Sequence, residues 1–277
     1  MFDTHCHLNF KVFNKNLSEV IERAGKAGVN RFVIPGTDLE NSKRAVEIAE
    51  KYEGVYAAVG IHPHHALNIN PKSSITKFFG AKNLLSPLLK LIIHPEVVAI
   101  GEVGLDKHQY TKTKYQDYQI DPEFIERQKE LLIEQIKLAK KYKKTIILHN
   151  REATEDILEI LTNNQSLITN NQTVFHCCEP DDRLLEFAIK HKIFIGVDGD
   201  VTYREDKQSF VKKIPLDLLV LETDSPFLFP RLRQGYGGQV NEPKNLPIIA
   251  EFIANLRGKK VDVIQKKTEK NSKNLFF

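Results

Sequence analysis

The chain has 277 residues, of which 41% are hydrophobic and 27% are charged, and this composition excludes a disordered or low-complexity protein. Its formal net charge of +4 permits a nucleic-acid partner without requiring one, because a solvated basic surface gives the same excess. The odd count of three cysteines argues against a disulfide framework and is typical of a reducing cytosol.

Short apolar runs alternate along the chain with longer amphipathic segments. In chain order, the sequence predicts a strand at residues 2–8 followed by a helix at 17–27, and a strand at 31–35 followed by a helix at 41–52. A third strand at 55–61 is followed by an irregular helical region through about residue 91. A strand at 97–101 precedes a polar loop and a long helix at 122–143, for which Asp121 and Pro122 suit the cap and the first turn. Three further strands each have a helix after them: 145–149 with 152–161, 173–177 with 181–190, and 192–197 with 205–212. The last strand, at 218–223, is followed by helical segments at 246–256 and 261–273.

The predicted strands are apolar and largely β-branched, as parallel strands buried on both faces are. Eight β/α units in succession predict the α/β class and a TIM-like (β/α)8 barrel, whose usual size is about 250 residues. We find no internal repeat and no linker, and therefore expect a single domain over residues 1–277. A doubly wound open sheet is the alternative.

Neither the first residues of the chain nor its most apolar stretch looks like an export signal or a membrane span. Asp3, His5 and His7 introduce polar side chains where a signal peptide would be apolar. Prolines and charged residues interrupt the apolar stretch 84–100, which cannot span a bilayer as a continuous helix. We expect a soluble, cytoplasmic monomer without a membrane partner.

Polar side chains occur at the C-terminal ends of the predicted strands, the end at which barrel enzymes carry their catalytic residues. These side chains are His5, His7, His62, His64, Glu102, His149, His176 and Asp224. Side chains alternate along a strand, so His5 and His7 point the same way and can share a metal ion, although such a pair can also be merely polar. Imidazole and carboxylate ligands suit Zn²⁺, Mn²⁺ or Mg²⁺.

Glu102 and Asp224 are the two carboxylates of this set. A buried Glu102 needs cations or hydrogen-bond donors, and bridging two metal ions would supply them; a structural salt bridge is the alternative. Asp224 precedes a turn at Ser225–Pro226 and would ligate a metal ion and accept a proton from the attacking water. We expect two divalent cations, which together could activate a bound water molecule.

Six segments resemble, in order, the motifs of the TatD family of metal-dependent hydrolases. They are residues 2–8, 60–64, 100–106, 148–153, 175–177 and 221–228, and a similar post-barrel motif follows at 241–243. The resemblance implies a TIM barrel and a metal-dependent deoxyribonuclease, often exonucleolytic, with single-stranded DNA or 3′ ends as its substrate.

The resemblance also implies roles for individual residues. One metal ion would be held by His5, His7, Glu102 and Asp224. The second would be held by Glu102, His149 and His176, with Glu102 as the bridge. His62, His64 and Arg151 would line the phosphate pocket, where Arg151 could pair with two phosphate oxygens; surface polar residues beside a pocket are the alternative.

Two segments depart from the family pattern. Cys177–Pro180 replaces a Ser-Gly-containing turn, so that Pro180 offers no N–H to phosphate and Glu179 would repel an anion. Cys178 would either face the side of His176 or pack in the core. The Gly-rich residues 231–239 resemble an inserted loop, in which Arg231 and Arg233 either contact DNA or lie on the surface.

The predicted loop after Glu102 interleaves basic and aromatic side chains. They are Lys107, His108, Tyr110, Lys112, Lys114, Tyr115 and Tyr118. Cations contact phosphates and aromatic rings stack on unpaired bases, so this loop could bind a single strand, or it is an ordinary loop.

Two other function classes stay open beside the nuclease. The same scaffold could hydrolyse an ester, amide or aminoacyl-tRNA bond, although Glu102 occupies the place where amidohydrolases with a carbamylated lysine carry that lysine. A catalytically inactive nucleic-acid binder is the third class, and the presence of all six candidate ligands argues against it.

Overall fold

The computed structural model describes residues 1–68, 81–82, 84–111, 118–168, 171–231 and 239–277. In these ranges eight parallel strands form one sheet in the sequential order β1 to β8. The strands are β1 (Phe2–Asp3), β2 (Arg31–Pro35), β3 (Val55–Val59), β4 (Val97–Asp106), β5 (Thr145–Arg151), β6 (Thr173–Phe175), β7 (Phe194–Val197) and β8 (Leu219–Leu221).

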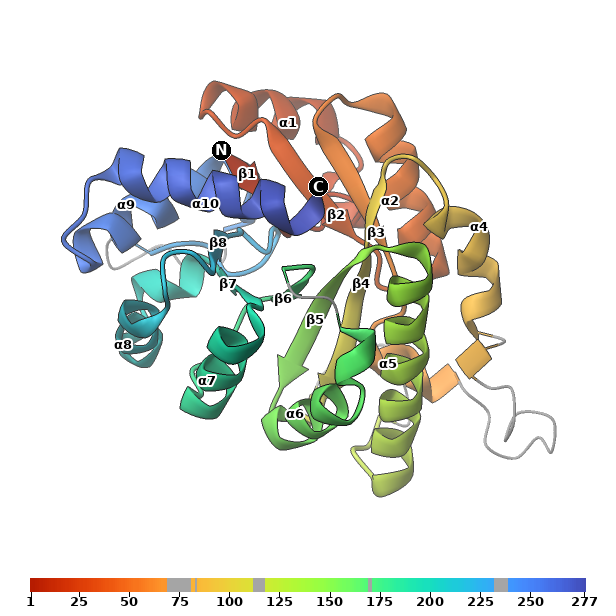
Figure 1. Ribbon diagram of the computed structural model, residues 1–277. Coiled ribbons are helices and arrows are strands. Elements are labelled where there is room, and N and C mark those ends of the chain that lie inside the picture. The colour runs from red at the N-terminus through yellow and green to blue at the C-terminus, as the bar shows by residue number, and fades with distance from the viewer. Residues whose placement is uncertain (69–80, 83, 112–117, 169–170, 232–238) are drawn as a thin grey trace.

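Helices surround the strands, as Figure 1 shows. The α-helices are α1 (Leu17–Lys26), α2 (Leu39–Lys51), α4 (Leu89–Ile92), α5 (Pro122–Tyr142), α6 (Thr154–Asn163), α7 (Asp182–His191), α8 (Glu205–Lys213), α9 (Leu246–Leu256) and α10 (Val261–Phe276). Short 3-10 helices include η2 (Pro63–Asn68), η3 (Ser86–Leu88), η5 (Gly199–Thr202) and η6 (Pro243–Asn245). Of the helices in the described ranges, none has the length and apolar character needed to cross a bilayer.

Residues at the two ends of the sheet bring β8 and β1 together. The Thr4 amide donates to the Leu221 carbonyl at 3.1 Å, and the Asp3 carboxylate accepts from both the amide and the hydroxyl of Thr223. Sequential strand order combined with this contact gives a nearly closed ring. The structure therefore confirms the predicted (β/α)8 barrel and excludes the doubly wound sheet.

Two apolar clusters hold the barrel together. A large one lies between the strands and the surrounding helices and includes Phe32, Ile100 and Phe124. A smaller one contains residues from within the strands, such as Val33, Ile147 and Val220, and Leu275 and Phe276 of α10 join it. Helix α10 therefore packs against the N-terminal end of the barrel and leaves the C-terminal end for the polar residues.

The bounds of β2 agree with the sequence prediction, and of the strands that differ from it, β1 and β4 differ most. β1 ends at Asp3 because the following residues alternate their partners: the Cys6 amide donates to Val33 of β2 and the His7 amide donates to Ser225 beyond β8. β4 continues to Asp106 because it stays paired with β5 as far as Arg151. The longer β4 brings Asp106 to the same end of the barrel as Glu102.

Helix α5 fixes the ends of β3 and β4 with buried amides. The Asp121 carboxylate caps its N-terminus by accepting from the Phe124 amide, as predicted. Gln128 accepts from the Asp106 amide and donates to the Asp106 carbonyl, and Gln135 does the same for Ile61. Each glutamine side chain supplies the hydrogen bonds that a neighbouring strand would otherwise make with the amide and carbonyl at that strand end. The ends of β3 and β4 are therefore held in place by α5.

Candidate metal centre

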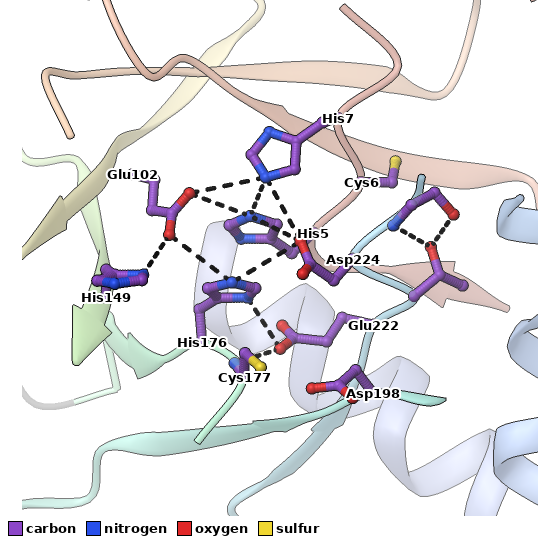
Figure 2. A network of polar contacts seen from close by, with 12 residues as sticks. His5, Cys6, His7, Glu102, His149, His176, Cys177, Asp198, Glu222 and Asp224 are labelled. Atoms are coloured by element: carbon purple, nitrogen blue, oxygen red, sulfur yellow. Dashed lines mark hydrogen bonds and ion pairs between the residues drawn. The ribbon is translucent and has the colours of Figure 1, made fainter. Parts of the chain in front are cut away.

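The six predicted metal ligands lie together at the C-terminal end of the barrel, although they come from the ends of five different strands. They are His5, His7, Glu102, His149, His176 and Asp224 (Figure 2). The Nε2 atoms of His5 and His7 lie 3.2 Å apart, so the alternation expected for this pair holds. The contact between β1 and β8 brings His5 and His7, near the start of the chain, beside Asp224.

The two oxygens of Glu102 face different imidazoles. Its Oε2 lies 3.6 Å from Nε2 of His5 and 3.7 Å from Nε2 of His7. Its Oε1 lies 2.7 Å from Nδ1 of His149 and 3.8 Å from Nε2 of His176. Figure 2 shows this division of the donors into two groups around one carboxylate.

Asp224 completes the group around His5 and His7. Its Oδ1 lies 3.4 Å from Nε2 of His7, 3.8 Å from Nε2 of His5 and 3.9 Å from Nε2 of His176. The residue has a positive φ of 50°, a conformation that aspartate tolerates better than most residues. Its amide donates to the His5 carbonyl at 2.9 Å, which fixes the strained backbone beside the ligands.

The donor set fits divalent cations. In the part of the chain that the structure describes, Oδ1 of Asp224 and Nδ1 of both His5 and His7 are buried without a hydrogen-bond partner. Two carboxylates and four imidazoles would be costly to bury together without positive charge among them. Side chains of these kinds, in groups whose ligand atoms lie within 4.8 Å, match the ligands of Zn²⁺, Mn²⁺ and Mg²⁺.

Burial and neighbouring charged groups shift the pKa values of Glu102, His149 and His5. Burial disfavours ionisation of Glu102, but the imidazoles of His62 and His149 outweigh it and hold the pKa of this carboxyl well below its usual range. Burial opposes the charge of His149 too, yet its hydrogen bonds with Asp106 and Glu102 raise its pKa to about 9. For His5, burial and the nearby His176 lower the pKa.

Glu222 contacts His176 on the ring nitrogen that faces away from Glu102 and Asp224. Its Oε1 lies 3.0 Å from Nδ1 of His176, which leaves Nε2 directed at Glu102 and Asp224. Although burial disfavours the charged imidazole, Glu222 raises the pKa of His176 to about 10. Gly196 makes room for this carboxylate, because a Cβ there would lie 2.5 Å from its Oε2.

Asp106 is a site residue that the sequence analysis missed, and Glu222 is another. The buried Oδ2 of Asp106 lies 2.9 Å from Nε2 of His64 and 3.1 Å from Nε2 of His149, and it accepts from the hydroxyl of Tyr110. Alternation was a usable signal, because Asp106 is four residues after Glu102 and Glu222 is two residues before Asp224. Both contact a predicted ligand histidine, His149 or His176, through the ring nitrogen that faces away from the cluster centre.

The three residues expected to line a phosphate pocket occupy different depths. His62 is near the centre, with Nε2 3.7 Å from Oε1 of Glu102, whereas His64 contacts Asp106. Arg151 is exposed at the rim, where it donates to the hydroxyl of Tyr110 at 2.9 Å and lies over that ring. Tyr110 thus connects the rim to Asp106.

The segment 177–180 has a structural explanation. Cys178 packs in the large apolar cluster, so the packing alternative for this residue holds. Arg204 donates two hydrogen bonds to the Glu179 carboxylate, which offsets the charge expected to repel an anion. The Cys177 amide donates to Glu222 and adds to the support of His176.

Two predicted nucleic-acid contacts fall partly outside the described residues. Arg231 is exposed and lies over the Tyr203 ring, 4.4 Å from its centroid, and Arg233 is outside the described residues. Of the loop after β4, Lys107, His108, Tyr110 and Tyr118 are described, and Lys112, Lys114 and Tyr115 are not. Tyr110 and Tyr118 both pack against the His64 ring.

Known proteins match the chain over nearly its whole length. The sequence profile described as TatD related DNase matches residues 2–277. The uncharacterized metal-dependent hydrolase YabD of Bacillus subtilis is 36% identical over 278 residues, covering 100% of this chain and 98% of that protein. The 3′-5′ ssDNA/RNA exonuclease TatD of Escherichia coli is 29% identical over 280 residues, with 100% and 98% covered. The solved structure of the TatD homologue YjjV of Escherichia coli has a TM-score of 0.82 at 31% identity, covering 100% of this chain and 97% of that one.

Proposed function

Since the chain belongs to the TatD related DNase family and is a metal-dependent hydrolase, we propose that it is a deoxyribonuclease that hydrolyses phosphodiester bonds with two divalent cations. The observation that supports the proposal most is the division of donors around Glu102, since Oε2 faces His5 and His7 whereas Oε1 faces His62, His149 and His176. A carboxylate in that position suits a bridge between two ions.

Two groups of ligands follow from this division. His5, His7 and Asp224 would hold one cation together with Oε2 of Glu102. His149 and His176 would hold the other together with Oε1 of Glu102. Cations bound there would supply Lewis-acid activation of water and neutralisation of the phosphate charge.

The chain's own residues would then bind and orient the substrate. Asp224, whose Oδ1 lacks a hydrogen-bond partner among the described residues, would accept the proton of the attacking water. Arg151 stands at the rim and would pair with a phosphate oxygen, with His62 and His64 closer to the centre. Relatives named as 3′-5′ ssDNA/RNA exonucleases support single-stranded DNA and 3′ ends as the substrate.

A cleavage assay with defined metals tests the proposal. Protein stripped with EDTA and reloaded with Mg²⁺, Mn²⁺ or Zn²⁺ would be given end-labelled single-stranded DNA and the matching duplex. We expect cleavage from 3′ ends that requires the added metal and stops with EDTA. Hydrolysis of an aminoacyl ester without any cleavage of DNA would instead identify the alternative hydrolase, and DNA binding without hydrolysis would identify an inactive binder.

Asp224→Asn tests the role of that carboxylate. The amide keeps an oxygen ligand but cannot accept the proton, so we expect turnover to fall by roughly 10²- to 10⁴-fold while part of the metal binding remains. Single-turnover cleavage and isothermal titration with Mn²⁺ measure the two quantities. Asp217→Asn, at an exposed carboxylate just before β8, is the matched control. Turnover at the wild-type rate in Asp224→Asn would remove the assignment.

A further inference from the structure

An exposed aromatic ring lies directly beside the metal centre. Phe227 is 51% exposed, although it follows Asp224 by only three residues. Its ring centroid lies 6.1 Å from that of the ligand His7 and 6.1 Å from that of Phe10. Phe10 in turn stacks on His7, with centroids 4.4 Å apart and ring planes 21° from parallel.

The position of Phe227 is fixed by its backbone. Its amide donates to the Asp224 carbonyl at 2.8 Å, and the adjoining Ser225 carbonyl accepts from the His7 amide at 2.7 Å. The same short turn therefore holds the metal ligand and the exposed ring. A phenyl ring that stays largely exposed in a fixed position gains little from burial, so stability of the fold does not explain its placement.

We propose that Phe10 and Phe227, the Phe platform, form a stacking site for the unpaired base next to the scissile phosphate of a nucleic-acid strand. This inference rests on the proposed nuclease function and adds a determinant of substrate choice to it. A phosphate held by the cluster around His7 would have its base one sugar away, within reach of the platform, whose two rings lie 4.4 Å and 6.1 Å from the His7 ring. The planes of the two rings are 77° apart, so a base would stack on the exposed face of Phe227 with Phe10 at its edge. Such a site suits any of the four bases, because every base offers a π face.

The platform would let the protein distinguish unpaired from base-paired ends of a nucleic-acid strand. A base in a duplex already stacks and pairs with its neighbours, so it must leave them to reach Phe227. A base at an unpaired end can stack on Phe227 without first breaking a base pair. The protein would therefore cleave single-stranded ends, and 3′ overhangs, more efficiently than blunt duplex ends of the same sequence.

Binding without catalysis tests the platform first. A single-stranded oligonucleotide with 2-aminopurine at its 3′ end would be titrated with the protein in EDTA, and stacking on Phe227 is expected to quench the fluorescence. Phe227→Ala should lose the quench and weaken binding by about 5- to 100-fold, whereas Phe227→Trp should restore both. Phe277→Ala is the matched control, because Phe277 is 67% exposed and packs against Phe2 and Tyr56 at the opposite end of the barrel.

Cleavage kinetics separate the platform from the nuclease function itself. With an ordinary 3′ end, Phe227→Ala should raise KM by about the same factor as the loss of binding and leave Mn²⁺ affinity unchanged. With an abasic 3′ nucleotide, the wild type and Phe227→Ala should cleave equally. Wild-type cleavage with no difference between the two proteins on the ordinary end would overturn the platform and leave the nuclease standing. No cleavage by the wild type, with the quench intact, would overturn the nuclease alone.

Discussion

At the scale of single residues, Glu222 shows how a side chain outside the proposed set of metal ligands can orient a member of that set. It contacts His176 on the ring nitrogen opposite the cluster, and it also accepts from the Cys177 amide and the Thr4 hydroxyl. A carboxylate placed behind a ligand histidine selects its tautomer and increases its basicity. The lack of a side chain at Gly196 is what allows the carboxylate to lie there.

Glu222→Gln and Gly196→Ala should both weaken metal binding. The first removes the charge behind His176, and the second pushes the carboxylate away, so we expect a loss of about 10- to 100-fold in affinity for one of two Mn²⁺ ions. Isothermal titration of EDTA-stripped protein measures this. Glu242→Gln, at a carboxylate paired with Arg23 outside the centre, should leave the affinity unchanged. Equal affinities in all variants would remove the role given to Glu222.

The residues that the sequence revealed and those that it hid differ in a physical way. His5, His7, Glu102 and Asp224 lie at the ends of apolar runs, so their place at the barrel mouth could be predicted, and alternation places Asp106 and Glu222 there too. The roles of Asp106 and Glu222 depend on which ring nitrogen of a histidine faces the centre. That choice is made by long-range contacts, and spacing along the chain carries no information about it.

At the scale of elements, α5 holds the strands that carry the site. Its two buried glutamines pair with the backbone of Asp106 and Ile61, at the ends where β4 and β3 would otherwise leave buried amides without partners. The amphipathic pattern of residues 122–143 predicted this helix and its Asp121 cap. It did not predict that Gln128 and Gln135 would be buried, because glutamine is commonly an exposed residue.

Gln128→Leu should destabilise the protein and displace Asp106. The leucine fills the space but leaves the amide and carbonyl of Asp106 unpaired, which we expect to lower the free energy of unfolding by about 1–3 kcal/mol. Urea unfolding monitored by circular dichroism measures the change. Gln165→Leu, at an exposed glutamine, should change stability by less than about 0.5 kcal/mol. A similar small effect for Gln128→Leu would contradict the proposed role of α5.

Strand boundaries were the least predictable part of the fold. The number and order of the strands followed from their apolar composition, and the structure confirms them. β1 was predicted too long and β4 too short, because each end is decided by partners on neighbouring strands: Val33 and Ser225 for the first, and β5 for the second. Local propensity cannot report how far a neighbouring strand extends.

At the scale of the whole molecule, metal binding should be coupled to protons. Metal ions bind neutral imidazoles, whereas the raised pKa values of about 9 for His149 and about 10 for His176 keep both protonated near pH 7 in protein without metal. Binding must then release these protons. The affinity should rise from pH 6 to pH 8, by about tenfold per pH unit for each proton released.

Titration with Mn²⁺ in two buffers of different ionisation enthalpy counts the released protons. We expect between one and two protons at pH 7, and fewer as the pH approaches 10, because the imidazoles are then already neutral. Glu222→Gln removes the main support for the charged form of His176 and should lower the count at pH 7. An affinity that falls with rising pH over this range would contradict the coupling.

The contact that closes the ring between β8 and β1 also determines when the molecule becomes able to react. His5 and His7 lie just beyond β1, and Asp224 lies just beyond β8, so their meeting depends on the Thr4–Leu221 and Asp3–Thr223 hydrogen bonds. A partly folded or truncated chain would hold only fragments of the ligand set. We therefore expect the proposed hydrolytic activity to require the completed tertiary structure, and an incompletely folded chain to lack it.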